Sequence, residues 1–154
     1  MGKIEDVVKL KTGYANFVEL KTAFQATQEN TDRMAMYRPT KAHRTAFERI
    51  CRGLYQPNDK KFYLLSGSYG TGKSHLCLMI ANVLSRSSGD PEISGFYENY
   101  AKLDSEMAKQ LKNIRKDGQF LVAICDFTSG RNFEDIIMKA VFEACVAKGL
   151  DAGV

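Results

Sequence analysis

A chain of 154 residues with 44% hydrophobic and 26% charged side chains has the size and composition of one globular domain. No apolar run approaches the roughly 20 residues that a membrane-spanning helix needs, and the first residues lack the apolar segment of a secretory signal. The four cysteines form no Cys-x-x-Cys pair, so neither a disulfide nor a zinc site is expected. We therefore expect a cytoplasmic protein with no membrane partner.

The net charge of +4 is concentrated in the N-terminal part of the chain. Residues 1–61 carry 12 basic and 7 acidic side chains, whereas the remaining residues carry 10 and 11. Such a bias is compatible with a polyanionic partner such as DNA, although a solvated protein face is the commoner explanation.

Residues 1–38 are predicted to form an N-terminal arm or short strands. Apolar and polar residues alternate loosely over 3–24, and the stretch 25–38 is mostly polar and is expected to be a loop. From Thr40 to Tyr55 the apolar residues fall at helical spacing. This pattern predicts an amphipathic helix, and its exposed side is basic, with Lys41, Arg44, Arg49 and Arg52.

Two short apolar runs are typical of buried parallel strands. Residues 62–66 stop at a glycine-rich turn, and residues 120–125 form the most apolar run, which ends at Asp126. Helical periodicity predicts further helices over 73–85, over 95–116 and from Phe133 to about Lys148. Strands that alternate with helices predict an α/β fold with a parallel sheet.

The turn after the first apolar run has a recognisable motif. Every fixed position of the pattern G-x-x-x-x-G-K-[ST] is matched by Gly67-Ser68-Tyr69-Gly70-Thr71-Gly72-Lys73-Ser74. Glycines allow the backbone to turn successive N–H groups inward, and the following helix adds the positive end of its dipole. We therefore expect a P-loop for the phosphates of a nucleoside triphosphate, with ATP favoured because no Asn-Lys-x-Asp motif is present.

Individual residues of the loop have distinct expected roles. Lys73 should bridge the β- and γ-phosphates as a catalytic residue, and the Ser74 hydroxyl should bind Mg²⁺. Thr71 and the backbone of Ser68 and Tyr69 should close over the phosphates. His75 either contacts the γ-phosphate side or is a surface or partly buried histidine of the helix.

The motif specifies the expected fold further, as the three-layer sandwich of a P-loop NTPase. Such a domain usually needs about five parallel strands, and only two convincing ones are found. Residues 39–154 are therefore expected to be the first part of the domain, and the chain an N-terminal fragment of a longer protein.

Hydrolysis also needs a Walker B carboxylate near the magnesium ion. Asp126 is the candidate, because it ends a strongly apolar run. The fit is poor, since Phe127 rather than an acid follows it, and Gly130 lies one residue too far away for the GTPase pattern D-x-x-G. The alternative is a Walker B residue beyond Val154.

The loop GSYGTGKSH and the later segment LVAICDFTSGRNFEDII resemble the N-terminal region of large bacterial phage-resistance ATPases. These are BREX-type P-loop proteins of the BrxC/PglY kind, related in outline to AAA+ ATPases. The resemblance implies ATP turnover linked to DNA, other defence-system proteins as partners and possible homo-oligomers. It also implies that Walker B lies downstream.

The sequence leaves three interpretations of the motif open. The first is an ATPase module that binds and hydrolyses ATP. The second is a switch in which ATP orders an interaction surface without turnover. The third is a small-molecule or nucleotide kinase, although no arginine-rich lid region is found.

Overall fold

We describe the protein from a computed structural model, which defines residues 18–56, 58, 61–113, 120–130 and 132–150. Helices account for all the regular secondary structure in these ranges. They are α1 Leu20–Gln25, α2 Thr27–Met36, α3 Lys41–Tyr55, α4 Lys73–Ser85, η2 Pro91–Ile93, α5 Ser94–Leu103, α6 Ser105–Asn113, η3 Phe127–Ser129 and α7 Phe133–Ala147. The described part of the chain is therefore all-α.

The predicted α/β sandwich with a parallel sheet is wrong for this structure. Residues 62–66 and 120–125 are extended, but neither forms a strand ladder within the described ranges. A strand needs a neighbour for its backbone N–H and C=O groups, and an apolar run alone does not provide one. Phe62 and Leu64 are 83% and 80% exposed, so the first run is not a buried strand either.

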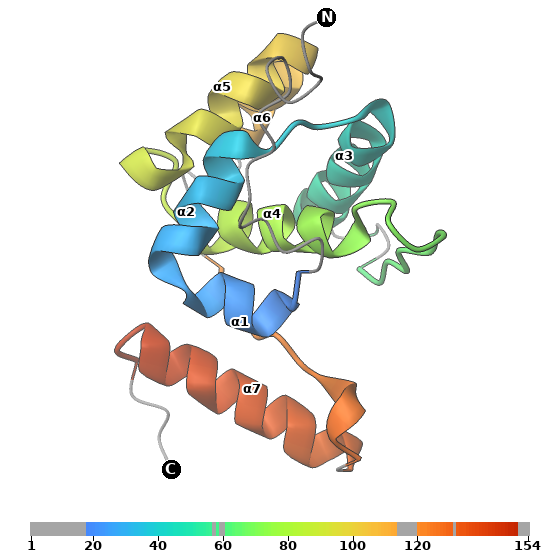
Figure 1. Cartoon of the computed structure of the whole chain (residues 1–154), viewed down its shortest axis with the longest axis vertical. Coiled ribbons are helices and arrows are strands. Elements are labelled where there is room, and N and C mark those ends of the chain that lie inside the picture. Colours follow the sequence, from blue (N-terminus) through green and yellow to red (C-terminus); the bar gives the residue numbers. More distant parts are fainter. Residues whose placement is uncertain (1–17, 57, 59–60, 114–119, 131, 151–154) are drawn as a thin grey trace, which may run out of the picture.

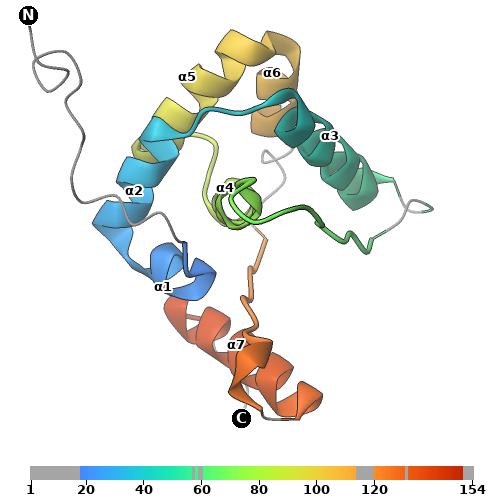
Figure 2. The same cartoon turned by 45° about the vertical axis from the view of Figure 1, so that its right-hand side comes forward.

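The centre of the fold is α4. In Figure 1, α2 and α3 lie above α4 and α1 lies below it. Figure 2 shows that the helices around α4 form an arc, in the order α1, α2, α5, α6 and α3. Its sequence explains this position, because a helix that is apolar on all sides is stable only when it is surrounded. The buried residues of α4 are Leu76, Leu78, Met79, Ala81, Asn82, Val83 and Ser85.

An aromatic cluster fills the space between α4 and the helices that flank it. Phe96 of α5 is fully buried and contacts four other aromatic rings, with centroids 5.3 to 5.7 Å apart. Stacked and edge-on ring pairs at such distances contribute stabilising free energy in addition to that from the apolar area they bury. The four rings are those of Tyr37, Phe47, Tyr97 and Tyr100.

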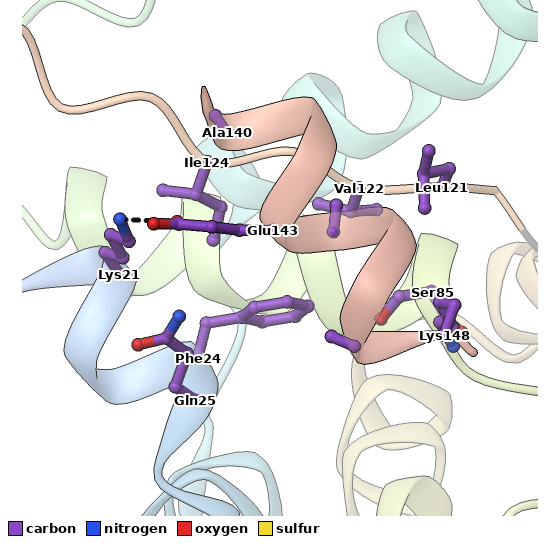
Figure 3. Close-up of a pocket in the computed structure, with 12 residues that line it drawn as sticks. Lys21, Phe24, Gln25, Ser85, Leu121, Val122, Ile124, Ala140, Glu143 and Lys148 are labelled. Atoms are coloured by element: carbon purple, nitrogen blue, oxygen red, sulfur yellow. Dashed lines mark hydrogen bonds and ion pairs between the residues drawn. The ribbon is translucent and has the colours of Figure 1, made fainter. Parts of the chain in front are cut away.

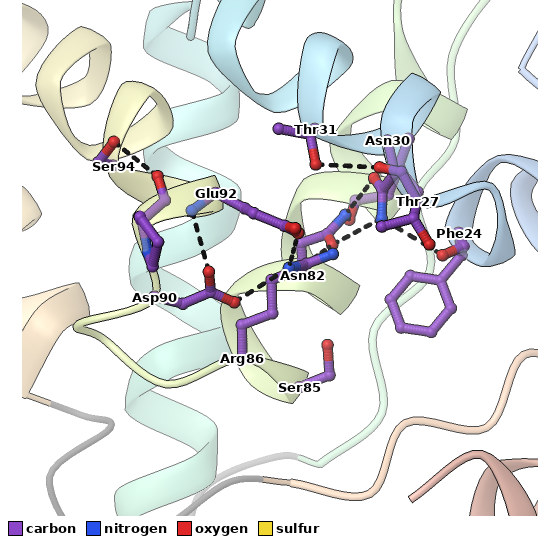
Figure 4. A network of polar contacts seen from close by, with 12 residues as sticks. Phe24, Thr27, Asn30, Thr31, Asn82, Ser85, Arg86, Asp90, Glu92 and Ser94 are labelled. Carbon is purple, nitrogen blue, oxygen red and sulfur yellow. Dashed lines mark hydrogen bonds and ion pairs between the residues drawn. The ribbon is translucent and has the colours of Figure 1, made fainter.

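Buried polar contacts fix the C-terminal half of α4 to its neighbours (Figure 4). Asn82 and Asn30 of α2 exchange two side-chain hydrogen bonds of 2.9 and 2.8 Å, and both residues are completely buried. Arg86, which follows α4, donates to Asn82, Asp90 and Glu92. Because the two buried amides satisfy each other and the partly buried Arg86 adds three hydrogen bonds, this end of α4 is held in one position.

Three local expectations need correction. Leu20–Gln25 and Thr27–Met36 are helices, where the sequence predicted extended chain and loop; residues 1–17 lie outside the described ranges. The expected helix 95–116 is divided into α5 and α6 at Asp104. The Asp104 side chain accepts from the backbone N–H of Met107 at 2.9 Å and so begins α6 as its N-cap.

A small cavity of about 90 Å³ lies between α7, α1 and the extended segment 121–124 (Figure 3). An ion pair of 2.7 Å between Lys21 and Glu143 and a hydrogen bond from Lys148 to the Ser85 carbonyl connect α7 to the other helices. The outer side of α7 stays exposed, with Met138 at 67% and Val146 at 59%. Across the described ranges, the helices are all too short or too polar to cross a membrane.

Candidate phosphate-binding loop

The predicted loop lies between the extended segment 61–66 and the first turn of α4. Gly70 and Gly72 both have φ of +80°, in the left-handed region that residues with a side chain rarely adopt. Gly67 lies close to Thr71, because a Cβ on this glycine would come within 3.2 Å of the Thr71 hydroxyl. Glycine at these positions is therefore what lets the loop fold tightly.

Lys73 folds back over the loop that precedes it. Its ammonium nitrogen lies 2.9 Å from the Gly67 carbonyl and 2.7 Å from the Ser68 carbonyl, and 3.5 Å from the Thr71 hydroxyl. Thr71 in turn donates to the Ser68 carbonyl at 2.9 Å. The lysine charge is thus held on neutral acceptors of the loop, which a phosphate oxygen can replace.

The N-terminus of α4 leaves its first backbone donors available. The first hydrogen bond of the helix runs from the Leu76 N–H to the Gly72 carbonyl, at 2.9 Å. The N–H groups of Lys73, Ser74 and His75 come before it, so they have no acceptor inside the helix. Gly72 is the N-cap and has no side chain with which to cap them. Such an end is suited to an anion.

The residues present fit a triphosphate better than they fit a bare metal ion. Ser74 is exposed in the first turn of α4, where its hydroxyl can bind Mg²⁺ together with phosphate oxygens and water. Among the described residues, no group of three His, Cys, Asp or Glu side chains could hold a metal ion. The Tyr69 side chain is 89% exposed and leaves the loop uncovered.

The loop rests against a histidine that the sequence did not single out. His43, in the first turn of α3, lies beside Gly72. A Cβ atom added to Gly72 would be 3.6 Å from the Cε1 and Nε2 atoms of His43. On its other side, His43 Nδ1 is 2.6 Å from the Tyr37 hydroxyl. His43 and Gly72 are 29 residues apart in the sequence, so no local sequence pattern indicates this contact.

His75 faces the interior rather than the loop. Its ring meets that of Tyr37 edge-on at 5.3 Å, and its Nε2 is buried without a hydrogen-bond partner in the described structure. Burial lowers the pKa of His75, and the positive charge of Arg33 lowers it further. The structure therefore places His75 as a partly buried neutral histidine, one of the two alternatives from the sequence.

Asp126 has its contacts outside the loop. It caps η3 by accepting from the backbone N–H of Thr128 at 2.9 Å and from the Thr128 hydroxyl at 2.7 Å. These two hydrogen bonds lower the pKa of Asp126. The positive charge of Lys21 in α1 lowers it further. The structure does not bring Asp126 together with Lys73 or Ser74, and its role as Walker B stays a prediction.

The basic face of α3 is partly neutralised. Arg44 forms an ion pair of 2.5 Å with Asp104, whereas Lys41 and Arg49 are exposed. The side chain of Arg52 lies outside the described part of the structure. DNA as a partner of this face stays a prediction.

We compared the chain with protein-family models, curated proteins and solved structures, and none of the three comparisons gave a match.

Proposed function

We propose that the chain binds the phosphates of a nucleoside triphosphate, with ATP as the expected nucleotide, at Gly67–Ser74. The observation that carries the proposal is the position of Lys73. Its ammonium group lies over the loop at the end of α4 that has uncapped N–H groups. A lysine beside three N–H groups that have no acceptor inside the helix, at one glycine-rich turn, is the arrangement of an anion site of the P-loop kind.

Binding requires small local changes of the chain. Lys73 leaves the carbonyls of Gly67 and Ser68 for phosphate oxygens, and it thereby exchanges neutral acceptors for charged ones. The N–H groups of Ser74 and His75 donate to a neighbouring phosphate. Magnesium, when bound at Ser74, neutralises phosphate charge and polarises the phosphate that is transferred.

Titration calorimetry with Mg-ATP tests the proposal. The wild-type chain should bind, and Lys73→Ala should bind about 10 to 100 times more weakly, because a charge-assisted hydrogen bond contributes about 1.5 to 3 kcal/mol. Lys109→Ala is the matched control, since Lys109 is an exposed lysine paired with Glu106 on α6. Equal affinity of the wild type and Lys73→Ala would overturn the proposal.

Turnover is a separate prediction, since no carboxylate of the described residues forms an ion pair with Lys73. Phosphate release by the wild type and its absence in Lys73→Ala would support an ATPase. Binding without release would support the ATP-dependent switch, and transfer of phosphate to a small acceptor would support the kinase.

The wider role rests on the resemblance to BREX-type ATPases alone. Action in an anti-phage defence system, contact with DNA or with other defence proteins, and assembly into homo-oligomers all stay predictions. DNA binding by Lys41 and Arg49 should weaken steadily as salt rises, because phosphate neutralisation releases counterions.

A further inference from the structure

The contact between α3 and the loop suggests a specific role for His43. Its ring lies between two partners, the Tyr37 hydroxyl at Nδ1 and the loop at its Nε2 edge. Burial lowers the pKa of His43, and the neighbouring Thr71 backbone partly opposes this shift by favouring the protonated ring, as a carbonyl acceptor does. The neutral tautomer that satisfies both partners therefore has its proton on Nε2.

Tyr37 fixes this tautomer from the protein interior. Its side chain is 2% exposed, and burial raises its pKa well above the usual range, so the hydroxyl keeps its proton and donates to Nδ1. Burial also lowers the pKa of His43 itself. The pair thus presents one N–H, on Nε2, to the loop.

Peptide geometry connects this N–H to the phosphate side. The Thr71 carbonyl and the Gly72 N–H belong to one planar trans peptide and point in opposite directions. Glycine at 72, with φ of +80°, makes this peptide easy to rotate. A hydrogen bond that holds the carbonyl against α3 therefore also directs the Gly72 N–H away from α3.

We propose that His43 is a positioning residue of the phosphate loop, which holds the Thr71 carbonyl through Nε2 while Tyr37 holds the ring. The inference rests on the proposed function, because it concerns the same phosphate site. It adds that the loop depends on α3 for the orientation of the Gly72 N–H.

Two substitutions at residue 43 separate positioning from packing. His43→Leu removes the donor, whereas His43→Gln keeps an amide N–H that can reach the Thr71 carbonyl. We expect His43→Leu to bind Mg-ATP about tenfold more weakly than the wild type, and His43→Gln to bind within about threefold. Thr45→Ala, an exposed position further along α3, is the control and should bind as the wild type does.

Tyr37→Phe tests the second contact and keeps the ring in the aromatic cluster. We expect Mg-ATP affinity to fall about threefold, because the imidazole is no longer fixed. The double variant Tyr37→Phe/His43→Gln should bind like His43→Gln and be more stable than it, since His43→Gln alone leaves the buried Tyr37 hydroxyl without its acceptor.

A measurement without nucleotide tests the positioning role independently. The amide resonance of Gly72 should shift in His43→Leu and return toward its wild-type position in His43→Gln. An unchanged Gly72 resonance together with unchanged affinity in folded His43→Leu would overturn the inference. So would equally weak binding by His43→Leu and His43→Gln. If the wild type bound no Mg-ATP but the Gly72 resonance still followed residue 43, the proposed function would fail while the positioning contact stood.

Discussion

Two segments of this chain begin in the same way and end differently. In each, an extended apolar run is followed by a turn and then a helix: residues 62–66, the glycine loop and α4 in the first, and residues 120–125, η3 and α7 in the second. The N-cap of the first helix is Gly72, which offers no capping side chain, and Lys73 is its first residue. The N-cap of the second helix is Asn132, whose side chain accepts from the Asp135 N–H at 2.9 Å.

The difference lies in what is left for a ligand. At α7, Asn132 uses one free donor, and Glu134 and Asp135 place negative charge at the positive end of the helix dipole. The side chain of Asp126, which precedes α7, already accepts hydrogen bonds from the N–H and the hydroxyl of Thr128. At α4, the described residues include no side chain that caps the first N–H groups, and the nearby charge of Lys73 is positive. A similar succession of elements therefore produces a capped, acidic helix start at α7 and an uncapped helix start beside a lysine at α4.

The largest effect should come from making the start of α4 acidic like that of α7. Gly72→Asp and Gly72→Asn introduce side chains of nearly equal size that tolerate a positive φ better than most residues do. Because only the aspartate repels phosphate, Gly72→Asp should bind Mg-ATP at least about tenfold more weakly than Gly72→Asn. Calorimetry on the two variants measures this ratio; equal affinities would show that charge at this position does not matter.

A pair of glycine substitutions sharpens the comparison between the two turns. Gly72 and Gly130 have φ of +80° and +67°, and neither has an atom closer than 3.6 Å to an added Cβ. Alanine should therefore cost about 1 kcal/mol of stability at each position through backbone strain alone. Only Gly72→Ala should also weaken Mg-ATP binding. Urea unfolding and calorimetry together check this, and loss of binding in Gly130→Ala would contradict the comparison.

Removing the cap of α7 should affect stability and leave the phosphate site unchanged. Asn132→Ala deletes the hydrogen bond to the Asp135 N–H and should lower the free energy of unfolding by about 1 kcal/mol. Mg-ATP affinity should stay at the wild-type value. A change in affinity would mean that the two helix starts are coupled, which the account does not predict.

The smallest effect concerns pH. Burial lowers the pKa of His43 and of His75 below the ordinary value of 6.5, and the charge of Arg33 adds to the shift at His75. The folded chain then takes up these protons less readily than the unfolded chain does, so stability should fall as pH falls through about 6.5. Three carboxyl groups also have lowered pKa values, and their protonation reduces stability only at more acidic pH. They are those of Asp104, Asp126 and Glu143.

Urea midpoints at pH 7.5 and 5.5, on either side of the roughly 6.5 of an ordinary histidine, measure this dependence. Since these are the only two histidines of the chain, the variant His43→Gln/His75→Gln should lose most of the difference between the two midpoints. A wild-type midpoint that rises toward the lower pH would have the wrong sign for buried neutral histidines.

The sequence predicted those features whose cause is local. Helical spacing located α3, α4 and α7 within about a residue of their ends. The tight turn before α4 was predictable because Gly70 and Gly72 supply backbone angles that other residues avoid, whereas its phosphate-binding role stays a prediction. The contact of His43 with Gly72 was not predictable, because it depends on how α3 packs against the loop.

The remaining errors come from features that need a partner in space. Residues 62–66 have the composition of a strand, but Tyr63 instead donates from its hydroxyl to the Arg49 carbonyl of α3 at 2.9 Å. In the second run, the Phe120 N–H donates to the Leu84 carbonyl of α4 at 3.0 Å. The polar helix α2 is stabilised by Asn30, whose contact with Asn82 spans 52 residues. No local pattern encodes such contacts.

The most direct test of the account is a map of backbone amide shifts on addition of Mg-ATP to the wild-type chain. The largest shifts are expected at the amides of Gly70 to His75, and the amides of Asn132 to Asp135 should not shift. Shifts of equal size at both helix starts, or none at Gly70 to His75, would contradict the assignment of the open end of α4 as the phosphate site.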